Sequence, residues 1–297
     1  MKEHGLVSDL EAMMKLNADR RQSMRWLALG LAGLPLIGCG GGSATSSTTN
    51  STSSSTSSTS GSSTSTGSTS SGSSSGSTTS SGSCSVIPEE TAGPYPGDGT
   101  NSNSSGIVNV LAMSGVVRRD IRSSFNGATA TADGVPLTIK LKINNANANC
   151  GAASGFSVYL WHCDKDGNYS LYSTGVTNQN YLRGVQEADT NGEVVFTSIY
   201  PGCYSGRVPH IHFEIFPSLA KSSSVLNRIK TSQLTFPTAI SQEVYTDSRY
   251  SASVRNLAQI SFATDNVFSD GTSLQMATVT GNLTDGYVAT LTINVSA

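Results

Sequence analysis

Residues 193–216 read EVVFTSIYPGCYSGRVPHIHFEIF, and the fold class follows from this stretch. Apolar and polar side chains alternate over 193–199 and again over 211–216, which is the period of two that β-strands show. Between the two runs stands Pro201-Gly202, a pair typical of turns. The chain is therefore expected to leave one strand, turn and enter another.

The same alternation recurs along the rest of the chain, at residues 137–143, 156–161, 275–279 and 287–295. Turn signals such as Asp166-Gly167 and Asn191-Gly192 separate several of the runs, a rhythm that predicts an all-β, antiparallel β-sandwich. Helix is expected only over 219–232, with one further turn near 251–257.

The segment 1–39 is typical of a bacterial export signal. Arg20-Arg21 precedes the apolar run 26–37, which is too short to span a bilayer. The run ends at Leu36-Ile37-Gly38-Cys39, which resembles a lipobox, so Cys39 is expected to carry lipid. This order predicts a protein exported by a twin-arginine-type signal and anchored by lipid at the cell envelope or outside it. An uncleaved anchor, or an ordinary signal peptide with a chance cysteine, is the alternative.

Residues 40–83 are almost wholly Ser, Thr and Gly, so they have nothing to bury against the entropy of ordering and are expected to form a flexible linker. Residues 84–297 then form the one folded domain. The 18 basic and 20 acidic residues give a net charge of −2 without a basic stripe. This balance argues against nucleic acid as a partner, restricts membrane contact to the lipid anchor and favours a small substrate.

Once Cys39 is assigned to lipid, four cysteines remain: Cys84, Cys150, Cys163 and Cys203. An even number in an exported chain predicts two disulfides, whose pairing the sequence leaves open. A zinc or thiolate site is the rival interpretation, but no two of the four have C-x-x-C spacing.

The densest chemical signal is 200–213, where Tyr204, Arg207, His210 and His212 fall within nine residues. Residues two apart in a strand face the same side, so both histidines can point at one ion. Two strand histidines without a ligand are the plainer interpretation. A zinc site with three histidines would have to recruit His162, since nothing supplies an acidic third ligand at helical spacing.

Three ordered motifs together resemble the intradiol ring-cleavage dioxygenases, and most closely their secreted branch. The motifs are Trp161-His162-Cys163-Asp164 with Gly167 and Tyr169; Leu182-Arg183-Gly184 with Asp189 and Gly192; and Pro201-Gly202-x-Tyr204-x-x-Arg207-x-x-His210-Ile211-His212. The resemblance covers about 87–233 and continues weakly to the last strands.

This resemblance implies a β-sandwich that binds Fe(3+) through Tyr169, Tyr204, His210 and His212. It also implies cleavage of a catechol-type ring with O2 to a muconate-type diacid, with Tyr204 leaving the iron and taking a substrate proton. Two phenolates are hard donors that suit Fe(III), and the field of the cation can deprotonate them.

Four further residues receive roles from the resemblance. Arg207 stabilises the activated substrate, Gln233 helps to hold substrate or intermediate, and Pro94 with Tyr95 borders the substrate pocket. A surface arginine and a structural turn are the plainer interpretations of Arg207 and of Pro94-Tyr95. Only Ser205 and Gly206 separate Tyr204 from Arg207, where cytosolic members of the family have a long segment. This departure leaves the substrate open, and the chain is expected to be a monomer or a homodimer.

A non-catalytic β-sandwich module that binds aromatics, glycans or metal is the alternative function. A hydrolase is disfavoured because His162 and Asp164 are poorly spaced for a relay to a serine and no G-x-S-x-G elbow occurs.

Overall fold

The computed structural model describes residues 84–297. The expected export signal at 1–39, the lipid site at Cys39 and the linker at 40–83 lie outside the described residues, and these assignments stay predictions. Among the described residues, no helix has both the length and the apolar character that crossing a membrane requires.

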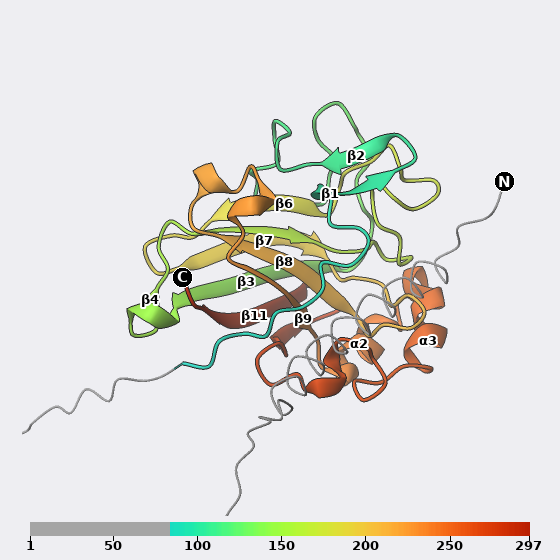
Figure 1. The fold of residues 1–297 in the computed structure, drawn as a ribbon. Helices are drawn as coiled ribbons and strands as arrows, with labels where there is room; N and C mark the ends of the chain where they lie inside the picture. The colour runs from blue at the N-terminus through green and yellow to red at the C-terminus, as the bar shows by residue number, and fades with distance from the viewer. Residues whose placement is uncertain (1–83) are drawn as a thin grey trace, which may run out of the picture. The chain divides into compact units, whose positions relative to one another are not determined.

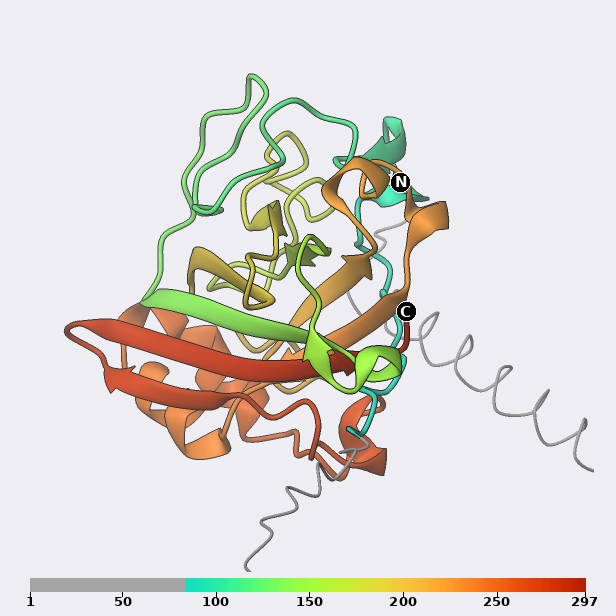
Figure 2. The same ribbon diagram turned by 90° about the vertical axis from the view of Figure 1, so that its left-hand side faces the viewer.

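Two main sheets form the domain (Figures 1 and 2). The first has the order β10 (Thr278–Asn282), β11 (Gly286–Val295), β3 (Pro136–Asn145) and β4 (Gly151–Ala152), with β7 (Glu193–Ile199) also paired to β3. The second has the order β6 (Arg183–Glu187), β5 (Ser157–Trp161), β8 (His210–Phe216) and β9 (Lys230–Thr235). A separate hairpin joins β1 (Asp98–Asn103) to β2 (Gly106–Asn109).

Helical segments are short. The α-helices α2 (Thr238–Val244) and α3 (Ser251–Leu257) lie together at one end of the sheets in Figure 1. Single 3-10 turns make up η1 (Ala146–Ala148), η2 (Leu219–Lys221), η3 (Val225–Asn227), η4 (Ser248–Tyr250) and η5 (Phe268–Asp270). The predicted all-β class is confirmed.

Alternation along β3 shows why the core lies between the sheets. Leu137, Ile139, Leu141 and Ile143 are buried, whereas Lys140 and Lys142 are exposed. On β8, by contrast, every residue is buried. Ile211, Phe213 and Ile215 enter the main core, so the opposite face of β8 is covered by something else. Loops and the lead-in residues Ala92 and Tyr95 pack over that face, beside Tyr159 and Trp161 of the neighbouring strand β5.

One strand pair departs from the antiparallel pattern. β11 runs parallel to β3, from Tyr287 opposite Leu137 to Val295 opposite Asn145, and the two strands lie side by side in Figure 2. All other pairs of named strands among the described residues are antiparallel. The sheet is therefore mixed. β11 pairs in parallel with one edge of β3, and β7 pairs antiparallel with the other edge.

The helix expected over 219–232 is wrong. That segment forms two 3-10 turns, η2 and η3, and then enters β9, whose residues 231–235 are buried against β8. Ser224 accepts a hydrogen bond from the backbone of Leu226, a local contact that competes with helix continuation. The expected turn near 251–257 is α3, whereas α2 and the strands β1, β2, β4 and β6 were not predicted.

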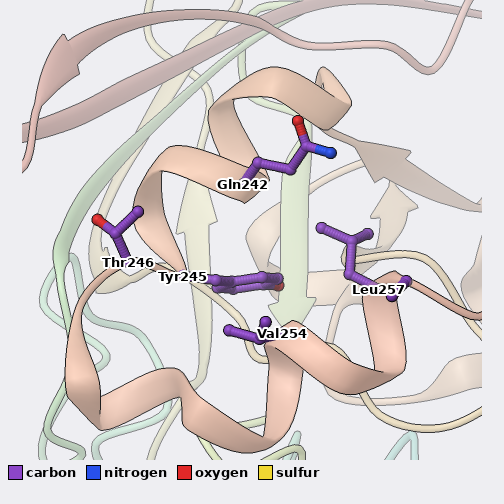
Figure 3. A pocket seen from close by; sticks show the side chains of 6 residues that line it. Gln242, Tyr245, Thr246, Val254 and Leu257 are labelled. Carbon is purple, nitrogen blue, oxygen red and sulfur yellow. The ribbon is translucent and has the colours of Figure 1, made fainter.

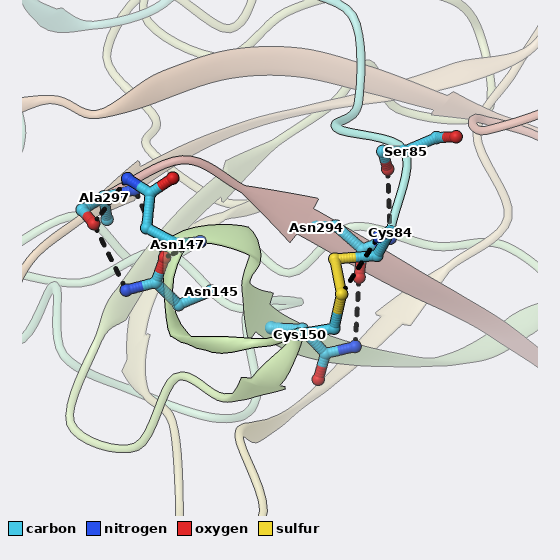
Figure 4. Close-up of a disulfide and its surroundings, with 8 residues drawn as sticks. Cys84, Ser85, Asn145, Asn147, Cys150, Asn294 and Ala297 are labelled. Atoms are coloured by element: carbon cyan, nitrogen blue, oxygen red, sulfur yellow. Dashed lines mark hydrogen bonds between the residues drawn. A yellow bond between two sulfur atoms is a disulfide. The ribbon is translucent and has the colours of Figure 1, made fainter. Parts of the chain in front are cut away.

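A disulfide joins Cys84 to Cys150, 66 residues apart (Figure 4). The residues that follow Cys84 are tied to β11, because the Ile87 amide donates to Asn294 O and the Asn294 side chain donates to Ser85 O. The expectation of a second disulfide is wrong: Cys163 and Cys203 are free and buried. Their thiols donate instead to two different carbonyls, those of Gly202 and Arg207.

Candidate metal centre

Four polar side chains converge on the outer face of β8. His210 Nε2 lies 3.1 Å from Tyr204 Oη, 3.4 Å from Tyr169 Oη and 3.1 Å from His212 Nε2. All four side chains are at most 6% exposed. Two imidazole nitrogens and two phenol oxygens therefore meet at one buried point, and these are the four residues expected as metal ligands. We call them the four-donor cluster.

The strand geometry of β8 places the two histidines. His210 and His212 point to one face while Ile211 points into the core. Trp161 on β5 stands opposite His212 in the register and stacks on its ring, with centroids 4.9 Å apart and planes 7° apart. The indole thus restricts the rotation of the imidazole about its χ angles.

Two glycines let the tyrosine-bearing loops approach each other. Gly167 has φ +85°, and a Cβ there would lie 2.9 Å from Cβ of Tyr204. A Cβ on Gly202 would lie 2.6 Å from Lys165 O and 2.8 Å from Asp164 O. Larger residues at either glycine would push the loop that carries Tyr169 away from the loop that carries Tyr204.

The histidine tautomer leaves a lone pair directed at the centre. His210 Nδ1 lies 2.7 Å from Val208 O, and a carbonyl only accepts, so Nδ1 carries the proton and Nε2 is unprotonated. Burial lowers the pKa of both His210 and His212 well below 6.5, which keeps the rings neutral. Neutral imidazole is the form that binds metal.

Burial shifts the pKa of the two tyrosines upward, whereas it shifts that of the histidines downward. Burial raises the pKa of Tyr204 to about 12 and that of Tyr169 well above its ordinary value. Without a cation both phenols therefore keep their protons at neutral pH. A trivalent ion would favour the phenolates, and the donor set of two phenolates and two neutral imidazoles suits a hard, highly charged cation.

The rival zinc site is not formed. Among residues 84–297, no group of three or more His, Cys, Asp or Glu side chains could hold a metal ion. His162 instead contacts Ser198 Oγ at 2.6 Å and Cys163 O at 2.7 Å. Asp164 accepts from Tyr181 Oη and from backbone amides, so His162 and Asp164 do not form a catalytic relay either.

Arg207 and Gln233 adjoin the four-donor cluster as expected. Arg207 is fully buried, with Nη1 3.4 Å from His210 Nε2 and Nη2 donating to Gln233 Oε1 at 2.7 Å. Gln233 on β9 faces His212 across the strand pair, and its Nε2 donates to Thr91 O at 2.9 Å. The interpretation of Arg207 as a surface arginine is wrong.

Sequence reasoning missed the partner of Arg207. Asp265 accepts from Arg207 Nε at 3.1 Å and 2.9 Å, and its carboxylate is completely buried. No motif or periodicity marks this aspartate, which comes 58 residues after the arginine. Only an unusual burial of charge identifies it, and burial is not visible in the sequence.

Of the two lead-in residues, Tyr95 contacts a member of the four-donor cluster. Its ring lies 5.1 Å from that of Tyr169 and 5.1 Å from that of Tyr172. Arg183, buried, donates to Tyr95 O at 2.9 Å and Pro96 O at 2.7 Å, which holds the lead-in in place. Pro94 is half-buried, and its carbonyl accepts from the Asn101 side chain.

A cavity of about 440 Å³ lies elsewhere, between α2 and α3 (Figure 3). Its lining is Gln242, Tyr245, Thr246, Val254, Leu257 and Ala258, none of which belongs to the four-donor cluster. The four-donor cluster and this cavity are therefore separate features of the domain.

Comparisons with known proteins point to one fold. The chain is 27% identical over 113 residues to the chlorocatechol 1,2-dioxygenase of Rhodococcus opacus, an alignment that spans 32% of this chain and 38% of that relative. In structure it is similar to an intradiol ring-cleavage dioxygenase from Tetranychus urticae, with a TM-score of 0.56 and 23% identity over 72% of this chain and 95% of the other. A second dioxygenase structure gives a TM-score of 0.55 at 23% identity. No protein-family model matches the chain.

The described domain therefore has the fold of the intradiol ring-cleavage dioxygenases. The resemblance drawn from the three sequence motifs is confirmed at the level of the fold.

Proposed function

We propose that this protein is a non-haem Fe(III)-dependent dioxygenase that cleaves catechol-type rings between the two hydroxyl-bearing carbons. Both atoms of O2 would be inserted, so that the product is a muconate-type diacid. The convergence of Tyr169, Tyr204, His210 and His212 within hydrogen-bond distances carries this proposal. The likeness in fold to an intradiol dioxygenase supports it.

The four-donor cluster fits a ferric ion by its chemistry. Two phenolates would offset two of the three charges, and two imidazoles would complete the set without adding charge. When bound, ferric iron supplies a Lewis acid that draws electron density from a coordinated catecholate and makes the ring reactive toward dioxygen.

Tyr204 is proposed as the proton acceptor for the incoming diol. Its pKa is raised to about 12 by burial, so a Tyr204 oxygen released by the cation would take and hold a proton at neutral pH. Tyr169, His210 and His212 would remain as ligands. His210 would be held by Val208 O, and His212 by the flat surface of Trp161.

Arg207 would stabilise negative charge that develops on the ring. Its Nη1 already faces the four-donor cluster, and burial strengthens its electrostatic effect because no water screens it. Gln233 fixes the neighbouring Nη2, and Tyr95 would border the ring of the substrate from the side of Tyr169. These residues orient the reactants and exclude water.

The decisive experiment measures colour, metal and oxygen uptake together. Protein loaded with iron should be red to burgundy from tyrosinate-to-iron charge transfer, and it should consume O2 with a catechol while a muconate accumulates. Tyr204→Phe should abolish turnover, whereas Tyr287→Phe, a buried tyrosine on β11, should not. Colourless protein with stoichiometric zinc, or aromatic binding without oxygen uptake, would favour a non-catalytic binding module instead.

The location of the protein is proposed from its sequence. Export by the segment 1–39 and lipid on Cys39 would hold the domain at the cell envelope through the linker at 40–83. Labelling with a radioactive fatty acid tests this, since Cys39→Ser should lose the label. A labelled C39S chain would contradict the lipid assignment.

A further inference from the structure

We propose that Asp265 is a positioning residue beside the four-donor cluster. Its carboxylate fixes the edge of Arg207 that faces the reacting ring. That Asp265 holds the guanidinium of Arg207 follows from the hydrogen bonds described below. The kinetic consequence rests on the proposed function.

The carboxylate of Asp265 accepts hydrogen bonds from two neighbouring residues of the loop that carries Arg207 and from two residues that follow Asp265 itself. Oδ1 and Oδ2 both accept from Arg207 Nε, and Oδ2 also accepts from the Val208 amide at 2.8 Å. The amides of Val267 and Phe268 donate to Oδ1 at 2.9 Å and 3.2 Å. A buried carboxylate with this many donors is itself held rigidly.

The guanidinium of Arg207 is consequently held at two of its edges. Asp265 holds Nε, and Gln233 holds Nη2. The ring of Phe268 lies 5.7 Å from Arg207 Cζ and limits tilting. Nη1 is then the edge that is directed at His210 Nε2. Because the guanidinium is planar, fixing two edges fixes the direction of the third.

The same carboxylate reaches a second member of the site through Val208. The Val208 amide donates to Asp265, and the carbonyl of Val208 accepts from His210 Nδ1 at 2.7 Å. One side chain therefore helps to position both Arg207 and the Val208 residue whose carbonyl holds His210. Neither effect requires Asp265 to touch a substrate.

The segment that carries Asp265 also holds the other end of this loop. The Cys203 amide donates to Ser253 Oγ at 2.9 Å, and Asn256 donates to Cys203 O at 2.7 Å; both side chains come from α3. The loop from Cys203 to Val208, which carries Tyr204 and Arg207, is thus anchored at both ends by residues 253–265. A short loop with two such anchors leaves Arg207 few alternative positions.

The first test is a comparison of Asp265→Asn with Asp270→Asn in the full chain. Asp270 lies five residues further on and is exposed, so its variant is a matched control for the loss of one charge. With iron bound, D265N should keep its iron content and colour and its KM within about threefold, while kcat falls on the order of 100-fold, as expected for a misplaced reacting group. D270N should remain within twofold of the wild type in each quantity.

The second test does not depend on turnover. In 15N-labelled protein the Nε–H signal of Arg207, identified by its absence in Arg207→Lys, should exchange slowly with water. D265N should speed this exchange at least about tenfold, and D270N should not. In the R207K background, D265N should change kcat less than threefold, because lysine has no planar guanidinium for Asp265 to orient.

The outcomes separate the two proposals. Wild-type protein without oxygen uptake would remove the proposed function, and the Nε–H comparison would still decide the role of Asp265. Unchanged exchange and unchanged kcat in D265N would overturn that role. If D265N does not fold, Asp265→Glu replaces it: the longer side chain should shift the Nε–H signal and lower kcat at constant iron content, and no change in either would reject the proposal.

Discussion

The indole of Trp161 lies flat on the imidazole of His212, with ring centroids 4.9 Å apart. Tyr159, two residues before Trp161 on β5, also stacks on the indole, with centroids 5.0 Å apart, so the indole is packed against both rings. His212 is thereby oriented by packing. Side chains that orient a ligand commonly change metal affinity by 10-fold to 100-fold when they are lost.

Replacing Trp161 by Leu should therefore weaken iron binding by about 10-fold to 100-fold. It should also destabilise the fold by about 2 kcal/mol through lost packing. Trp161→Phe keeps a flat ring and should stay within about fivefold of the wild-type affinity. Titration against a competing chelator gives the affinity and urea unfolding gives the stability. Equal iron affinities in W161L and W161F would contradict the role of stacking.

Gly167→Ala should disturb Tyr204 specifically. An added Cβ would lie 2.9 Å from Tyr204 Cβ. Gly175→Ala is the matched control, because Gly175 has a similar φ of +88° but nothing lies within 4 Å of its added Cβ. Both variants should lose about 1 to 2 kcal/mol from the left-handed backbone. Only G167A should also weaken the tyrosinate-to-iron absorption, and an unchanged spectrum would argue against the contact.

Removing the disulfide should destabilise the domain. The bridge between Cys84 and Cys150 closes a loop of 66 residues, for which the chain-entropy estimate is about 4 kcal/mol. The variant with both cysteines changed to Ser should therefore unfold at much lower denaturant concentration. Reduction of the wild type should produce the same shift. Identical unfolding midpoints for reduced and oxidised protein would show that the bridge does not form.

The thiols of Cys163 and Cys203 should be present but unreactive. Burial raises the pKa of Cys203 to about 12 and that of Cys163 well above its ordinary value, so neither is a thiolate at neutral pH. In a Cys39→Ser chain under non-reducing conditions, Ellman's reagent should detect almost no thiol in the native protein and about two per chain after denaturation. A thiol count near zero after denaturation would show that Cys163 and Cys203 form a second disulfide.

Stability should fall as the pH rises toward 8 because of Glu214. Burial, followed by the charge of Asp98, raises the pKa of Glu214 to about 8, although Arg228 lies 2.9 Å from its carboxylate. The folded protein thus keeps a proton that the unfolded chain loses near pH 4.5. Its contribution is fully present below that pH and is lost as the pH rises through about 8.

Glu214→Gln should flatten this decline, which we expect to be on the order of 2 kcal/mol between pH 5 and 9. Glu193→Gln, at an exposed glutamate of β7, should leave the decline unchanged. Unfolding curves at several pH values give the comparison. Parallel profiles for E214Q and the wild type would reject Glu214 as the source.

The local sequence predicted the strands and the pair of histidines. Alternation places His210 and His212 on one face of β8 because successive side chains of any strand point in opposite directions. The bounds of β7 agree with the predicted run at 193–199 for the same reason. Motif resemblance added Tyr169, Tyr204, Arg207 and Gln233, all of which lie at or beside the four-donor cluster.

Other predictions failed where distant parts of the chain compete with local preference. The segment expected to be a helix at 219–232 instead enters β9, because β8 offers it a strand partner and a buried face. Two disulfides were expected from the four cysteines, but the loops of Cys163 and Cys203 direct each thiol to a separate carbonyl.

Sequence alone therefore determined which side chains can act together along one strand, since that depends only on the geometry of neighbouring residues. Tertiary structure decided what surrounds them: Trp161 against His212, Gly167 beneath Tyr204 and Asp265 beside Arg207. These contacts join residues far apart in the chain, and they form only when the sheets and the C-terminal segment pack together. Burial of a charge such as Asp265 is a property of that packing and leaves no local pattern in the sequence.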